Sequence, residues 1–137
     1  MEPVICREVP LELSAAEAAL REALASRGFG VLTEVDVTAT LRQKLGIETR
    51  PYRILGACNP ALAHESLGLE PRVGAFLPCG ISLYEGNSKG ETIICLQNPE
   101  MISQSFTNPA LEPIARQARE RLEDAVRQVA ENAVAAT

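Results

Sequence analysis

The sequence is poor in aromatic residues and has no long apolar run. It contains no Trp, and aromatic residues make up 4% of its 137 residues. The core is therefore expected to consist of Leu, Ile, Val and Ala side chains. Because no run of about 18 apolar residues occurs, no membrane partner is predicted. The first residues also lack the basic and apolar segments of a signal peptide, so we expect a small, soluble, cytoplasmic protein.

Positive charge is scarce as well. The chain has 13 Lys and Arg against 18 Asp and Glu, which gives a formal net charge of −5. Proteins that bind nucleic acid generally gather Lys and Arg on one face, so no nucleic acid partner is predicted. The length favours a single domain over residues 1–137, large enough to bury a core of its own.

Four cysteines are present, but none of them forms a Cys-x-x-Cys pair. This spacing excludes the simplest zinc-ribbon and thioredoxin-like motifs. In a cytoplasmic chain of this length, reduced thiols are favoured over disulfides. Cys6 and Cys95 lie within strand patterns that bring no polar partner near them in sequence. We expect both to be inert, apolar core residues.

Apolar alternation, glycines and three Asn-Pro dipeptides divide the chain into short elements. Each Asn-Pro dipeptide suits a helix start, and the spacing of Ser14 and Glu17 is that of a capping box. Strands joined by short turns predict an α+β fold, with a mainly antiparallel sheet and helices on one face. The expected strands are residues 4–9, 30–37, 50–57, 73–85 and 91–97. The expected helices are residues 14–28, a short segment ending at 46, residues 59–68 and 99–105, and a long C-terminal helix beginning between Pro109 and Pro113.

Residues 51–60 are the stretch around which reactive side chains gather. The pattern predicts a strand that delivers Cys58 to a helix opened by Asn59. A thiol beside the positive end of a helix can have a lowered pKa. His64, the only histidine, falls on the second turn of that helix. Cys79 follows a proline in a strand that we expect to bend there.

The favoured hypothesis is a binding module rather than an enzyme. Cys58 and Cys79, with His64 near them, would hold a soft ion such as Cu(I) or Zn(II), or act as a redox-responsive thiol pair. One alternative is a thiol-dependent enzyme in which Cys58 is the nucleophile and His64 its base. Another is a structural or interaction domain whose buried cysteines are inert and whose surface matters more than any cleft.

A third kind of site is an anion-binding one. The backbone amides that follow Asn59 at the helix start could bind a small anion. Arg50 or Arg53, both in the preceding strand segment, would supply the positive charge. A small-molecule ligand is therefore possible beside a metal ion.

Several motifs resemble a known family in their order and spacing. The resemblance covers roughly residues 10–130, nearly the whole chain. The matching segments are residues 28–41, 50–60, 62–64, 77–79 and 108–113. In these segments the chain resembles the family called domain of unknown function 302.

The resemblance implies a small α+β fold similar to half of the TATA-box-binding-protein arrangement, and it implies a homodimer. It does not imply DNA binding, which the acidic charge also disfavours. Because the family has no assigned activity, it transfers no catalytic residues to this chain. Cys58, His64 and Cys79 fall on family-like positions, whereas Cys6 and Cys95 lie outside them.

Overall fold

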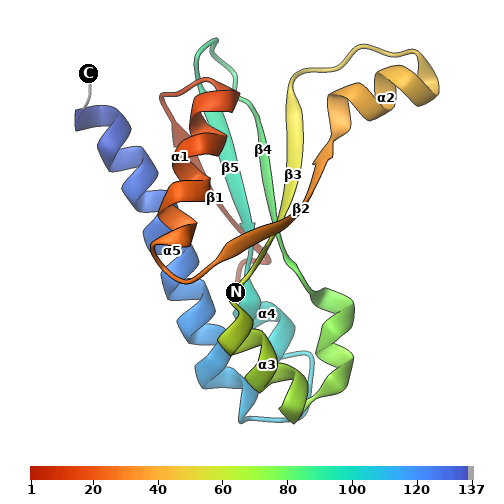
Figure 1. Ribbon diagram of the computed structural model, residues 1–137, viewed down its shortest axis with the longest axis vertical. Coiled ribbons are helices and arrows are strands. Elements are labelled where there is room, and N and C mark those ends of the chain that lie inside the picture. The colour runs from red at the N-terminus through yellow and green to blue at the C-terminus, as the bar shows by residue number, and fades with distance from the viewer. Residues whose placement is uncertain (136–137) are drawn as a thin grey trace.

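The computed structural model describes residues 1–135 and has an α+β fold (Figure 1). None of the helices in this range is long and apolar enough to cross a membrane. The elements, in chain order, are β1 (Val4–Val9), α1 (Leu13–Ala25), β2 (Gly30–Asp36), α2 (Val37–Leu45), β3 (Tyr52–Cys58), α3 (Pro60–Leu69), the 3-10 helix η1 (Pro71–Phe76), β4 (Cys79–Glu85), β5 (Thr92–Gln97), α4 (Pro99–Ser103) and α5 (Leu111–Ala135).

The five strands form one sheet in the order β1-β5-β4-β3-β2. Every pair of neighbouring strands is antiparallel, as the sequence predicted. Strands β3, β4 and β5 lie inside the sheet, while β1 and β2 form its edges. Because β3 is an inner strand, the residue at its end is held between β2 on one side and β4 on the other.

The core lies between one face of the sheet and the helices α1 and α5, which lie side by side in Figure 1. Every second residue of the inner strands points into it, as expected from strand geometry. Among residues 1–135, the core side chains are almost entirely aliphatic, and Phe29 is their one aromatic member. Its largest fully buried members are Leu20, Leu24, Leu55, Ile81, Leu83, Ile94, Leu96 and Leu122.

Two of the helices that border the lower end of the sheet begin at Asn-Pro dipeptides, as predicted. Asn59 accepts a hydrogen bond from the amide of Leu62 at 3.1 Å and opens α3. Asn98 accepts one from the amide of Glu100 at 3.0 Å and opens α4. Asn108, before α5, accepts one at 3.0 Å from the amide two residues further on. Local capping therefore fixes the starts of α3 and α4. Helix α5 begins only at Leu111, so the prediction of a helix start at the third Asn-Pro dipeptide was wrong.

Two local predictions were wrong. Helix α1 begins at Leu13 and has no side-chain cap, so Ser14 lies inside the helix and no capping box forms. Residues 71–76 are a 3-10 helix rather than the start of a strand. The Glu70 carboxylate accepts a hydrogen bond from the amide of Arg72 and opens this turn. Strand β4 begins only after Pro78, because proline has no N–H to donate to a strand ladder.

Candidate functional site

A cavity of about 80 Å³ lies where the end of β3 meets α3, η1, α4 and α5. Both unpaired cysteines of the chain, Cys58 and Cys79, line it. No charged residue is among the described residues that line the cavity. Its apolar lining comes from Phe29, Ala57, Leu62, Ala63, Val73, Phe76, Leu77, Pro99, Ile102, Leu111, Ile114, Ala115 and Ala118, and its polar lining from Asn59, Ser66 and Ser103.

The register of β3 with β4 brings the two thiols together. Ala57 pairs directly with Cys79, so Cys58 follows the residue that faces Cys79. Successive residues of a strand point to opposite faces, but β3 ends at Cys58 and the chain turns there into α3. Both side chains therefore reach the same cavity. Each of them is half-buried, and Cys79 also packs against the core.

The surroundings of Cys79 favour a protonated thiol. Burial, and secondly the negative charge of an ionised Cys58, raise the pKa of Cys79 to about 11. At neutral pH the Cys79 sulfur therefore keeps its proton until a cation or a covalent bond replaces it.

Asn59 fixes the geometry directly after Cys58. Asn59 is buried, and its side chain caps α3 through the bond to Leu62. The turn before β2 packs against this cap, because a Cβ added at Gly28 would lie 3.2 Å from the Asn59 side-chain nitrogen. Gly28 has φ +81°, a left-handed conformation that favours glycine. The cap and this turn together hold the end of β3 in place.

The structure does not place His64 with the thiols. His64 lines a separate hollow between α3 and α5, together with Pro113 and Gln117. Within residues 1–135, no group of three or more His, Cys, Asp or Glu side chains is arranged to hold a metal ion. The predicted site is therefore reduced to two sulfur ligands, which is fewer than a tetrahedral Zn(II) site requires.

The arginines of the predicted anion site lie at the other end of β3 from Asn59. Arg53 forms an ion pair with Glu17, with Nη1 and Oε1 3.2 Å apart. Arg50 places its guanidinium 4.5 Å from the centre of the Tyr84 ring. A strand rises about 3.3 Å per residue, so even Arg53 lies roughly 20 Å from Asn59 along the chain. The structure does not assemble an anion site from these residues.

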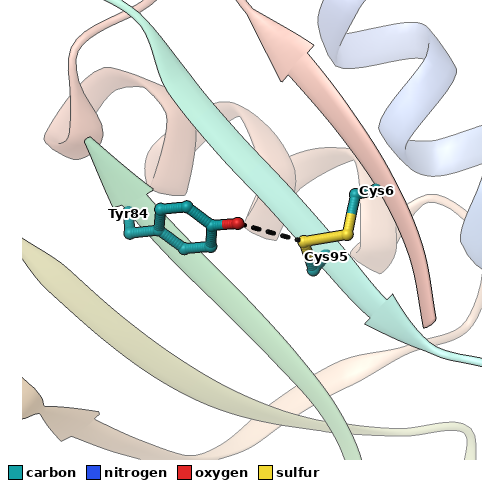
Figure 2. The surroundings of a disulfide bond; sticks show 3 residues. All are labelled: Cys6, Tyr84 and Cys95. Carbon is teal, nitrogen blue, oxygen red and sulfur yellow. Dashed lines mark hydrogen bonds between the residues drawn. A yellow bond between two sulfur atoms is a disulfide. The ribbon is translucent and has the colours of Figure 1, made fainter. Parts of the chain in front are cut away.

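Cys6 and Cys95 form a disulfide, so the prediction of reduced, inert thiols was wrong for this pair (Figure 2). The two residues lie directly opposite each other in β1 and β5, with Cα atoms 4.0 Å apart. The hydroxyl of Tyr84 lies 3.8 Å from the Cys95 sulfur. Cys6 is exposed rather than part of the core. The sequence held no local signal for the pairing, because 89 positions separate the two cysteines.

Comparisons with known proteins confirm the family resemblance. The family model described as "Domain of unknown function DUF302" matches residues 5–129. Among solved structures, the crystal structure of an uncharacterized conserved protein DUF302 from Bacillus stearothermophilus is 32% identical in sequence. That match covers 94% of this chain and 99% of the other, with a TM-score of 0.87. No curated protein matches the chain. The predicted α+β fold, with its antiparallel sheet and long C-terminal helix, is confirmed by this likeness.

Proposed function

This chain belongs to the DUF302 family, and because that description assigns no activity, we propose a function from the site itself. The protein is a binding module in which Cys58 and Cys79 hold one soft monovalent metal ion, Cu(I), between their two sulfur atoms. The observation that supports this proposal most directly is that both thiols line one uncharged cavity.

The ligand set selects the kind of ion. Two thiolates suit Cu(I), which binds soft sulfur ligands at low coordination numbers. Ca²⁺ and Mg²⁺ require several oxygen ligands, and no carboxylate lines the cavity among the described residues. Zn(II) is almost always held by four ligands in structural sites, and a third His, Cys, Asp or Glu ligand is missing from the described part of the chain.

The protonated state of Cys79 is consistent with this function. A Cu(I) ion must displace the Cys79 proton, because the pKa of this thiol is about 11. Binding of one Cu(I) ion to both sulfurs releases both thiol protons, so the occupied site carries one net negative charge. Without the metal, burial keeps the thiol neutral and unreactive.

An enzyme with Cys58 as nucleophile has less support. Such an enzyme requires a base within hydrogen-bond reach of the thiol. None of the described residues that line the cavity is a His, Asp, Glu or Lys. His64, the base that the sequence suggested, lines a different hollow.

The experiment is an anaerobic titration of Cu(I), held by the chromophoric chelator bicinchoninate, in the presence of ascorbate. The parent protein is expected to take one equivalent of Cu(I), and Cys58→Ser or Cys79→Ser to lose at least 100-fold in affinity. The double variant Cys6→Ser/Cys95→Ser is the matched control and should bind as the parent does. A parent that leaves Cu(I) on the chelator overturns the proposal. If that parent instead closes a Cys58–Cys79 disulfide under mild oxidation, the thiol pair is a redox site.

We also propose that the protein is a homodimer, and that the sheet face opposite α1 and α5 is the interface. Val35 and Ile54 lie opposite each other in the pairing of β2 with β3. Their side chains are 46% and 41% exposed, although both are large and apolar. They point away from the core, because the neighbouring Leu55 is fully buried on the other face. An apolar sheet face without a covering helix is typical of a contact surface.

A further inference from the structure

The cavity at the thiol pair extends beyond the two sulfur atoms. Cys58 and Cys79 belong to the end of the sheet, whereas most of the remaining lining comes from α3, η1, α4 and α5. A bare metal ion bridging the two sulfurs would leave this helical part of the cavity empty. The apolar part is therefore available for a group attached to whatever the sulfurs hold.

The polar side chains of the cavity make hydrogen bonds within their own helices. Ser66 donates to the carbonyl of Leu62 at 2.9 Å, and Ser103 donates to the carbonyl of Glu100 at 3.0 Å. The carbonyl oxygen of the Asn59 side chain accepts the amide hydrogen bond that caps α3. Because most of the lining residues are apolar and none is charged, the cavity favours an apolar group over a polar one that would lose its hydrogen bonds to water.

The volume limits the size of that group. An apolar cavity of about 150 Å³ takes up benzene. The cavity here, at about 80 Å³, is roughly half as large. A short alkyl chain of two to four carbons fits such a volume better than an aromatic ring does.

We propose that the site takes small organic compounds of trivalent arsenic, with arsenic on Cys58 and Cys79 and the short alkyl group in the apolar cavity. This inference rests on the thiol pair of the proposed function and adds the class of ligand. Two neighbouring thiols and an adjacent apolar space are the features that such a compound requires.

The bonds of the binding step balance without any oxidant or reductant. An alkylarsine oxide, R–As=O, meets the two neutral thiols. Two As–S bonds form, while the As=O bond and both S–H bonds break. The oxygen leaves with the two protons as one water molecule, and arsenic remains trivalent. The balanced reaction starts from two neutral thiols, so the raised pKa of Cys79 does not prevent it.

The test compares methylarsine oxide, n-propylarsine oxide and phenylarsine oxide by calorimetry, without reductant so that the Cys6–Cys95 disulfide stays closed. The parent is expected to bind the propyl compound about 15-fold more tightly than the methyl compound, since each of the two additional buried CH₂ groups contributes about fourfold. The phenyl compound should gain nothing over the propyl compound. Cys58→Ser and Cys79→Ser should abolish tight binding of all three.

Ala115→Leu fills the cavity and is the decisive variant, because Ala115 lines it and is buried. This variant should lose the preference for propyl over methyl. Ala133→Leu is the matched control, a buried alanine of the same helix that lies outside the cavity, and it should keep the preference. Circular dichroism spectra that match the parent show that both variants are folded. A second variant, Phe76→Ala, widens the cavity and should favour the phenyl compound.

Equal affinities for the methyl and propyl compounds in the parent overturn the inference, as does tight binding that survives Cys58→Ser. The two proposals fail separately. If Cu(I) stays on the chelator while the propyl compound binds with the expected preference, the metal function falls and the arsenical site stands. If Cu(I) binds and the arsenicals bind without preference, the inference falls and the metal function stands.

Discussion

Ala57 lies directly opposite Cys79 in the pairing of β3 with β4. This single register pair is the reason why two thiols 21 positions apart line one cavity. Cys58 follows Ala57 at the point where β3 ends and α3 begins. Its side chain therefore does not have to point to the face of the sheet opposite that of Ala57. A shift of the register by one residue would turn Cys79 to the other face of the sheet. The site therefore depends on how β3 and β4 pair, and on where β3 ends.

Raising the pH should destabilise the protein through Cys79. Its pKa rises on folding from about 9 to about 11, so the folded state holds more protons than the unfolded state between these pH values. The free energy of unfolding must then fall across this window, by about 3 kcal/mol in total. Below pH 9 the contribution is fully present. Urea unfolding at pH 8, 9.5 and 11 measures the decrease in the free energy of unfolding. In Cys79→Ala, the part of this decrease that comes from Cys79 should be absent.

The other groups that ionise at high pH are common to both proteins, so the difference between the two pH profiles isolates Cys79. Parallel profiles for the parent and Cys79→Ala would contradict the prediction. The same window should be visible in thiol labelling, because Cys79 reacts as a thiolate. Its labelling rate in the folded protein should continue to increase tenfold per pH unit up to about pH 11.

Asn59→Ala should weaken both the fold and Cu(I) binding. The substitution removes the cap of α3, which costs about 1 kcal/mol, and frees the chain directly after Cys58. Asn98→Ala is the matched control. Asn98 is equally buried and also caps a helix that begins with proline, but it does not line the thiol cavity. We expect a similar loss of stability in both variants, and a loss of Cu(I) affinity only in Asn59→Ala. Equal affinities in the two variants would show that the cap does not position Cys58.

Gly56→Ala should destabilise the sheet beside the site. A Cβ at Gly56 would lie 2.3 Å from the Thr33 hydroxyl oxygen and 2.4 Å from a ring carbon of Pro78. Both distances are far below contact, so β2 or the turn before β4 must shift, at a cost of about 1 to 3 kcal/mol. Gly30→Ala, in the neighbouring strand, meets nothing within 4 Å and should change stability little. Thermal unfolding of the two variants is the measurement, and equal melting temperatures would contradict the clash.

The local parts of the fold were predictable from the sequence. In an Asn-Pro dipeptide, the Asn side chain caps the helix and the proline suits its first position. The beginning of α3 at residues 59–60 therefore followed from short-range chemistry. The end of β3 at Cys58 followed from the same signal. The 3-10 helix at residues 71–76 was missed, because an apolar pattern of this length does not distinguish a turn from a strand.

The parts of the site that depend on distant contacts were not predictable. The Cys6–Cys95 disulfide depends on the register of two strands that are far apart in sequence. His64 was expected near Cys58, six positions earlier. Its side chain lies in the hollow with α5, and only the packing of α3 against α5 decides which side of α3 faces the cavity. Closeness in sequence to Cys58 does not determine whether a residue of α3 faces the cavity.

Reducing the Cys6–Cys95 disulfide should lower stability without emptying the thiol cavity. The bond joins residues 89 positions apart and so restricts the unfolded chain strongly. Its loss should lower the free energy of unfolding by about 2 to 4 kcal/mol. Cys6 is exposed, so a small dithiol reductant has access to the bond. Guanidinium unfolding with and without reductant is the measurement, and Cys6→Ser/Cys95→Ser should show no effect of reductant. A parent equally stable in both conditions would contradict the prediction. Cys58→Ser/Cys79→Ser should keep the full effect, because these cysteines lie outside the bond.

Charge on the exposed sheet face should separate the homodimer that we propose. Ile54→Lys places a positive charge on that face, in β3, where its cross-strand neighbour Val35 is also exposed. A charge at the core of an interface is costly to bury, so the equilibrium should shift to monomers by at least 100-fold in dissociation constant. Light scattering over a concentration series measures the mass. Leu45→Lys is the control, since Leu45 is 66% exposed at the end of α2 rather than on the sheet. A parent that is monomeric at every concentration would end the proposal.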